Sequence, residues 1–191
     1  MDLYQPSWRA RQFPYARIIC NHAGCCLVLL ILLCATPTGT TQAATFNVTN
    51  TADSGAGSLR QAIFDANAAG GTNTIDVQNG LGTITLTSGD LNALNSNITL
   101  NGNGNTLSGN NAFRGLFVYS GTVAINDLTI ENAVASGGDA GDAAGGGAGF
   151  GGALFVKDGA NVTISNLVAQ NNAATGGDGG AQTASGVTGG G

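Results

Sequence analysis

Two acidic residues are the best candidates for chemistry in this chain, because they stand four positions apart on a short apolar stretch. Asp127 and Glu131 could in principle supply the two carboxylates that glycoside hydrolysis needs. At the matching positions of a second repeat unit the chain carries the amides Asn166 and Gln170. Exchange of acid for amide is typical of solvated turns, so we expect no catalysis from this pair.

Other catalytic chemistries lack their residue types. The only histidine and all four cysteines lie within residues 1–34, so the rest of the chain cannot form a Ser–His or Cys–His pair. Zinc also loses its preferred ligands. An elimination reaction would need a base near the acids, but Arg114 and Lys157 fall at different positions of the repeat. We therefore expect no catalytic residue and no bound cofactor.

Three aspartates are the only candidates for a metal ion. Asp139 and Asp142 lie in a Gly-Gly-Asp-Ala-Gly-Asp segment that is similar to the nonapeptide calcium motif, and Asp178 follows a second Gly-Gly pair. No tandem nine-residue period accompanies them. Calcium at Asp139, Asp142 and Asp178 is therefore a hypothesis, and no other metal is expected.

Residues 1–44 have the composition of a signal peptide. Three arginines and one acid occupy residues 1–22, and an apolar run over residues 23–35 follows. That run is short for a membrane span of about 20 residues. Small residues come next, and we expect cleavage after Ala43 or Ala44. An uncleaved membrane anchor is the alternative.

The remaining chain is acidic and free of cysteine. Arg60, Arg114 and Lys157 face ten acids, for a net charge of −7. Without a basic stripe, a nucleic-acid partner is excluded. Without disulfides, stability must come from packing. This composition suits an exported protein.

A long internal repeat occupies the second half of the chain. The Leu-Phe-Val triplet at 116–118 recurs at 154–156, an offset of 38, and the segment 122–131 recurs at 161–170, an offset of 39. Self-similarity of this kind indicates a solenoid, in which each unit buries its apolar face against its neighbours. We expect one unit to make about two coils, with its glycine-rich stretch as a loop.

Residues 45–70 are expected to form an N-terminal cap. A short strand near Thr45 is followed by Ser58, a typical helix N-cap, with Gln61 completing a capping box. An amphipathic helix over residues 59–69 then covers the open end of the solenoid. Its apolar face consists of Leu59, Ala62, Ile63 and Ala66.

Short strands and Gly/Asn turns fill residues 71–191 and predict a parallel β-helix. Asn132 and Asn171 recur in phase, so we expect an amide ladder there, with ligand contact as the alternative. Phe117 and Phe155 also recur, and we expect an interior stack, with a sugar-stacking platform as the alternative. The glycine-rich stretches 137–152 and 176–191 are expected to be loosely ordered. The sequence ends in the second of these without a cap, so we expect a segment of a longer polypeptide.

One stretch carries a family resemblance. Residues 48–63, Val-Thr-Asn-Thr-Ala-Asp-Ser-Gly-Ala-Gly-Ser-Leu-Arg-Gln-Ala-Ile, are similar to the opening of bacterial surface proteins with a pectate-lyase-like right-handed β-helix. The segment 106–111 and the Gly-Gly-Asp loops resemble passenger regions of autotransporters and polymorphic outer-membrane proteins. The resemblance implies an all-β, right-handed parallel β-helix behind the capping helix. It implies no particular activity.

The resemblance leads to an expected function. We expect a non-enzymatic, exported protein of the bacterial cell surface or outer membrane that displays or adheres to an unknown ligand, held by a C-terminal membrane barrel that this sequence lacks. The alternatives are a secreted carbohydrate-active β-helix enzyme, either a polysaccharide lyase or a glycoside hydrolase, and a non-functional fragment.

Overall fold

The fold is known from a computed structural model that describes residues 42–142 and 144–181. The chain divides into two units, 1–38 and 39–191, and every described residue belongs to the second. The signal peptide predicted over 1–44 therefore lies almost wholly outside the described residues. The described part holds one helix and eleven strands, which are β1 (Thr45–Val48), α1 (Leu59–Ala69), β2 (Thr72–Val77), β3 (Thr83–Thr85), β4 (Asn97–Asn101), β5 (Thr106–Ser108), β6 (Leu116–Val118), β7 (Thr122–Glu131), β8 (Val134–Ser136), β9 (Leu154–Val156), β10 (Asn161–Gln170) and β11 (Ala173–Thr175).

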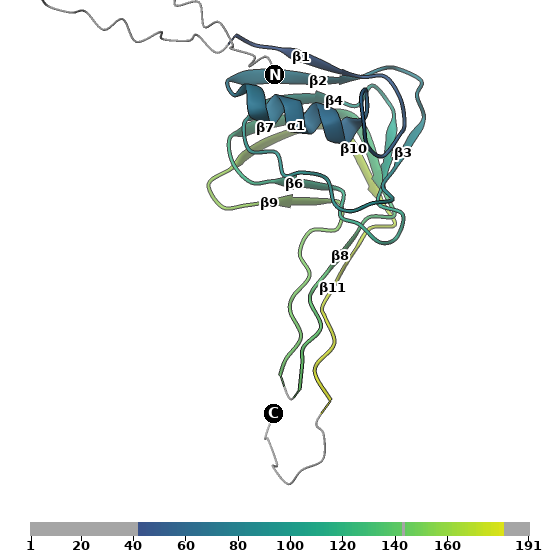
Figure 1. The fold of residues 1–191 in the computed structure, drawn as a ribbon, viewed down its shortest axis with the longest axis vertical. Helices are drawn as coiled ribbons and strands as arrows, with labels where there is room; N and C mark the ends of the chain where they lie inside the picture. Colours follow the sequence, from purple (N-terminus) through teal and green to yellow (C-terminus); the bar gives the residue numbers. More distant parts are fainter. Residues whose placement is uncertain (1–41, 143, 182–191) are drawn as a thin grey trace, which may run out of the picture. The chain divides into compact units, whose positions relative to one another are not determined.

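The strand pairs are all parallel, and their offsets along the chain up to β7 range from 23 to 29 residues. Ile75 of β2 pairs with Leu100 of β4, which pairs with Ile125 of β7, so the offset is 25 at each step. Leu107 of β5 pairs with Ile84 of β3 and with Ile130 of β7 at an offset of 23. Parallel neighbours need a long connection, so the chain makes a circuit between one strand and the next (Figure 1).

A bend lets the long strand β7 take part in two sets of pairs. Its first half pairs with β4 and its second half with β5, and the whole strand pairs with β10. Asp127, at the junction, has a φ of 50°, and the matching Asn166 of β10 has a φ of 53°. Asn and Asp tolerate this left-handed conformation better than other non-glycine residues. The recurring polar residue therefore marks a corner of the chain.

The repeat unit corresponds to one circuit, so the expectation of two coils is wrong. Leu128 pairs directly with Leu167 at an offset of 39, and Leu116 pairs with Leu154 at an offset of 38. The repeat offsets read from the sequence are thus confirmed as strand registers. The unit is longer than the earlier circuits because a glycine-rich excursion lies between β8 and β9.

The core consists of side chains that alternate inward along these strands. Ile75, Leu100 and Ile125 stand in register and are fully buried. Their counterpart in β10, Ile164, is 48% exposed, because within the described residues no further strand covers β10. Burial of each apolar position therefore depends on the presence of the next strand.

Helix α1 packs its predicted apolar face against the first strands. Leu59, Ala62, Ile63 and Ala66 are its buried residues, and the helix contacts β1 and β2. The Ser58 side chain accepts a hydrogen bond from the Gln61 N–H over 3.2 Å, which confirms the N-cap. The predicted capping box is wrong in its second bond, between the Gln61 side chain and the backbone N–H of Ser58, because the Gln61 side chain donates instead to Asp65.

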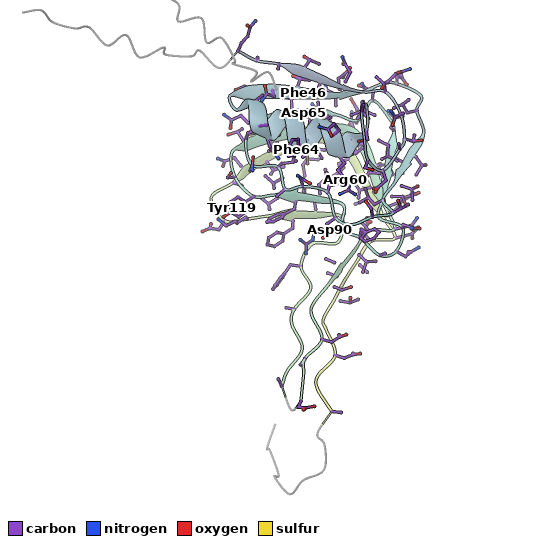
Figure 2. The ribbon with its side chains drawn as sticks, viewed as in Figure 1. Phe46, Arg60, Phe64, Asp65, Asp90 and Tyr119 are labelled. Atoms are coloured by element: carbon purple, nitrogen blue, oxygen red, sulfur yellow. The ribbon has the colours of Figure 1, made fainter. Side chains whose placement is uncertain are left out.

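A partly buried ion pair ties the cap to a later loop. Arg60 Nη2 lies 2.8 Å from Asp53 Oδ1, and the two side chains are only 18% and 11% exposed. Arg60 also donates to the carbonyls of Asp53, Gly89 and Asp90, and Asp53 accepts from the N–H and hydroxyl of Ser88. This Asp53–Arg60 clamp joins the region around the start of α1 to the distant loop at residues 88–90; Arg60 and Asp90 are labelled in Figure 2.

The clamp predicts a pH dependence of stability. Burial raises the pKa of Asp53, but hydrogen bonds from Ser88 and Arg60 and the charge of Arg60 outweigh it, so the pKa lies below its usual value. A lowered folded-state pKa contributes stability above the unfolded value of about 4 and loses it as pH falls through the folded value. We expect wild-type urea midpoints to fall below about pH 4 more steeply than those of Asp53→Asn. Parallel pH profiles of the two proteins would contradict this.

The glycine-rich excursion is ordered by backbone hydrogen bonds, which the sequence did not predict. Segments 137–141, 144–152 and 175–180, together called the glycine stem, run beside one another. Gly147 N–H donates to Gly138 O and Gly177 N–H to Gly147 O, each over 2.8 Å, and Gly137 N–H to Thr175 O over 2.9 Å. At Gly137, an added β-carbon would lie closer than 3.0 Å to the backbone of Gly147. Glycine is therefore needed here for close approach of three backbones.

Candidate functional site

The two carboxylates considered for catalysis are each held by an amide of the next strand. Asn166 Nδ2 donates to Asp127 Oδ1 over 2.8 Å, and Gln170 Nε2 donates to Glu131 Oε2 over 2.9 Å. Asp127 lies at the bend of β7 and Glu131 at its end, and each carboxylate is bonded to a different amide of β10. The arrangement supports strand stacking and does not form an acid–base pair.

The same order of acid followed by amide recurs at the outer face of β2, β4 and β7. Asn101 Nδ2 lies 3.4 Å from Asp76 Oδ1, and Asn126 Nδ2 lies 3.1 Å from Asn101 Oδ1. Like charges directly opposite in a sheet are destabilising, whereas an amide can both accept and donate along the stack. These columns therefore stack polar residues without stacking charge.

The pairing of an acid with an amide predicts how stability changes when a second acid replaces the amide. In Gln170→Glu, two carboxylates would face each other at an in-register pair, because Gln170 pairs with Glu131. We expect a loss of about 0.5 kcal/mol in the free energy of unfolding at pH 7, recovered at acid pH. The double variant Glu131→Gln/Gln170→Glu is the matched control, since it reverses the order but keeps one acid and one amide. If the single variant were as stable as this control at pH 7, charge avoidance would not explain the columns.

Asn132 and Asn171 recur because both positions require the same left-handed backbone conformation. Their φ angles are 50° and 53°, so both turn the chain in the left-handed region. The side-chain hydrogen bonds that the structure gives at this corner come from Asn172, which accepts from Ala133 N–H and donates to Ile130 O. The amide ladder expected between Asn132 and Asn171 is therefore wrong, because Asn172 makes the side-chain contacts at this corner.

The calcium candidates are distributed over the glycine stem. Asp139 Oδ1 accepts a hydrogen bond from the backbone N–H of Asp178 over 2.8 Å. Within residues 42–142 and 144–181, no three acidic, histidine or cysteine residues gather closely enough to hold a metal ion. The calcium hypothesis for Asp139, Asp142 and Asp178 gains no support from this geometry.

Phe117 and Phe155 lie on the outer face of the β6–β9 pair, so the expected interior stack is wrong. Leu116 and Val118 are buried, and Phe117 between them is half-buried. Successive side chains of a strand point to opposite faces, so the inward pair directs Phe117 outward. The two phenylalanines pair in register, with ring centroids 5.3 Å apart and a tilt of 52°.

Two further aromatic rings extend this outer face. Tyr119 packs edge-on against Phe117 at 6.0 Å, and Phe150 lies 6.1 Å from Phe155. Tyr119 is 47% exposed and Phe150 is 59% exposed, and Figure 2 labels Tyr119 beyond the end of β6. Tilted and edge-on contacts are favourable aromatic geometries. The four rings therefore form one cluster that faces solvent.

Both cations beyond helix α1 lie over these rings. Arg114 Cζ is 5.8 Å from the centroids of both Phe117 and Phe155, and Lys157 Nζ is 4.4 Å from the centroid of Tyr119. Among the described residues neither cation has a salt bridge, and Arg114 Nε is buried with no hydrogen-bond partner. We call the six residues Arg114, Phe117, Tyr119, Phe150, Phe155 and Lys157 the aromatic–cationic patch.

A polar hollow near the cap is a weaker candidate. It has a volume of about 430 Å³ and is lined by Asn47, Thr49, Asp76, Gln78, Asn79 and Asn103. Its one carboxylate, Asp76, already accepts from Asn101 and Asn103. The hollow therefore has no free carboxylate, because Asp76 and Asn103 already bond to each other.

Sequence reasoning weighed Phe117 and Phe155 but missed the patch as a whole. The usable signal was the alternation of Leu116 and Val118 with Phe117 and Tyr119, which assigns the aromatic residues to the outer face. Phe150 gave no signal, because it reaches the patch only through the path of the glycine stem.

Comparisons with family models, with curated proteins and with solved structures found no match to this chain. In the part of the chain that the structure describes, the only helix, α1, is too short to cross a membrane.

Proposed function

We propose that this chain is an exported bacterial cell-surface protein that displays a binding face on a right-handed parallel β-helix. The parallel pairs and the near-constant length of the circuits from β2 to β7 support a β-helix. The similarity of residues 48–63 to the opening of bacterial surface proteins with a pectate-lyase-like right-handed β-helix supports the handedness and the surface location. In this proposal α1 caps the first circuit, and stacked strands hold the outer faces rigid.

The observation that carries an adhesive role is the aromatic–cationic patch. Exposed aromatic residues and arginine are the residue types enriched in protein interfaces. The described acids Asp127 and Glu131 are held by amides, which favours binding over the alternative of a carbohydrate-active enzyme. The glycine stem carries Phe150 to the patch and so contributes to the same face.

Export and adhesion are tested on the full chain expressed in a bacterial host. We expect a processed N-terminus at residue 44 or 45, protease sensitivity on intact cells, and cell adhesion that falls on substitution of Tyr119 and Phe150 by alanine. A chain that keeps its first 44 residues inside the cell would overturn export. Release of unsaturated or reducing sugars from pectin, abolished by Asp127→Ala, would support the enzyme instead.

A further inference from the structure

We propose that the aromatic–cationic patch binds an extended peptide segment that carries acidic side chains and an apolar residue. This deepens the proposed adhesive function, on which it rests for its biological setting, by naming the chemistry of the partner. The acidic side chains would meet Arg114 and Lys157, and the apolar side chain would pack on Phe150.

Charge complementarity selects an acidic partner. Outside the expected signal peptide the chain has only three basic residues against ten acids. Arg60 is committed to Asp53 in a partly buried pair, whereas the side-chain nitrogens of Arg114 and Lys157 form no salt bridge in the described ranges. The Asp90 carboxylate accepts a hydrogen bond from the backbone N–H of Arg114. The patch therefore holds the two described cationic side chains without an ion-pair partner, and these can attract an anionic group of a ligand.

The arrangement of the rings favours a peptide over a sugar. A pyranose ring stacks on a flat, open aromatic face. Here Lys157 lies over Tyr119, Arg114 lies over both Phe117 and Phe155, and the ring planes are tilted by 37° to 84°. A carboxylate can take the free N–H donors of these cations without displacing them from the rings. The exposed edge of Phe150 remains for an apolar side chain.

The test measures binding of labelled peptides to the purified full chain by fluorescence anisotropy. The probes are a twelve-residue peptide of alternating Glu and Leu, the same peptide with Gln for Glu, and hyaluronan fragments as an acidic glycan. We expect the Glu peptide to bind at least tenfold more tightly than the Gln peptide, with affinity falling as salt is raised. Lys157→Gln and Arg114→Gln should each weaken binding about fivefold, the effect of one exposed charge pair.

Matched aromatic variants separate the patch from general stickiness. Phe150→Ala should weaken binding, whereas Phe64→Ala should not, because Phe64 is a similarly exposed phenylalanine (55%) that lies on α1 outside the patch (Figure 2). Circular dichroism checks that each variant folds, and the exposed side chain of Lys157 provides a variant that leaves the core intact.

Each outcome bears on the proposal. Equal binding of the Glu and Gln peptides, or binding unchanged by Lys157→Gln, overturns it. Tighter, patch-dependent binding of hyaluronan assigns the patch to glycans and also overturns the peptide partner. Loss of peptide binding with retained, patch-dependent cell adhesion rejects this inference but leaves the proposed function standing. Peptide binding by a chain that is not exported supports this inference but rejects the proposed export.

Discussion

Arg60→Ala is expected to lower the free energy of unfolding by about 3 kcal/mol. The guanidinium donates to the Asp53 carboxylate and to three backbone carbonyls. Its removal leaves a carboxylate that is only 11% exposed without its counter-charge, and leaves the carbonyls of the 89–90 loop without donors. Uncompensated burial of a charge is among the few mechanisms that make a single substitution severely destabilising.

The change is measured as the shift in urea midpoint at pH 7. Arg60→Lys should lower the free energy of unfolding by a smaller amount, because an ammonium group keeps the charge but cannot reproduce the forked contacts of a guanidinium. Lys157→Ala is the control for removing a cation from an exposed site, and we expect it to change stability by less than about 0.5 kcal/mol. Similar midpoints for Arg60→Ala and Lys157→Ala would show that the clamp does not hold the cap.

Gly137→Ala is expected to separate the glycine stem, whereas Gly138→Ala next to it should have almost no effect. A β-carbon at Gly137 would lie closer than 3.0 Å to the carbonyl group of Gly147 and to the N–H of Gly177. Backbone atoms cannot turn aside as a flexible side chain can, so the segments must move apart. At Gly138 an added β-carbon meets nothing within 4 Å.

Hydrogen exchange of the stem amides measures this effect. We expect protection at Gly147 and Gly177, whose N–H groups donate across the stem, to fall about 100-fold in Gly137→Ala. The amide of Ile125 in the core should be unchanged, because the stem contributes no side chain to that core. Equal protection in the Gly137 and Gly138 variants would mean that the three segments are not closely packed.

Loss of the stem would also test its connection with the patch. Phe150 lies on the 144–152 segment of the stem and contacts Phe155. If Gly137→Ala weakens both stem protection and peptide binding, the stem positions part of the patch. Binding that survives the loss of protection would place recognition on Arg114, Lys157 and the rings of β6 and β9 alone.

Local features of the fold could be predicted from the amino-acid sequence. It predicted the apolar face of α1 and its Ser58 cap, and the two repeat offsets that reappear as strand registers. These features depend on periodicity and on neighbouring residues. Side-chain alternation and helix capping are set within a few positions of the chain, so a single sequence contains the information.

The contacts between residues that are distant in the sequence became known only from the three-dimensional structure. It showed that one repeat makes one circuit, that Gln170 rather than Asn171 continues the polar column, and that glycines from three segments pack together. It also brought Arg114 and Phe150 to the rings of Phe117 and Phe155, and Lys157 to the ring of Tyr119. Each of these contacts joins residues that are far apart in the sequence. Which residues meet depends on the path of the loops between paired strands, and no local pattern predicts that path.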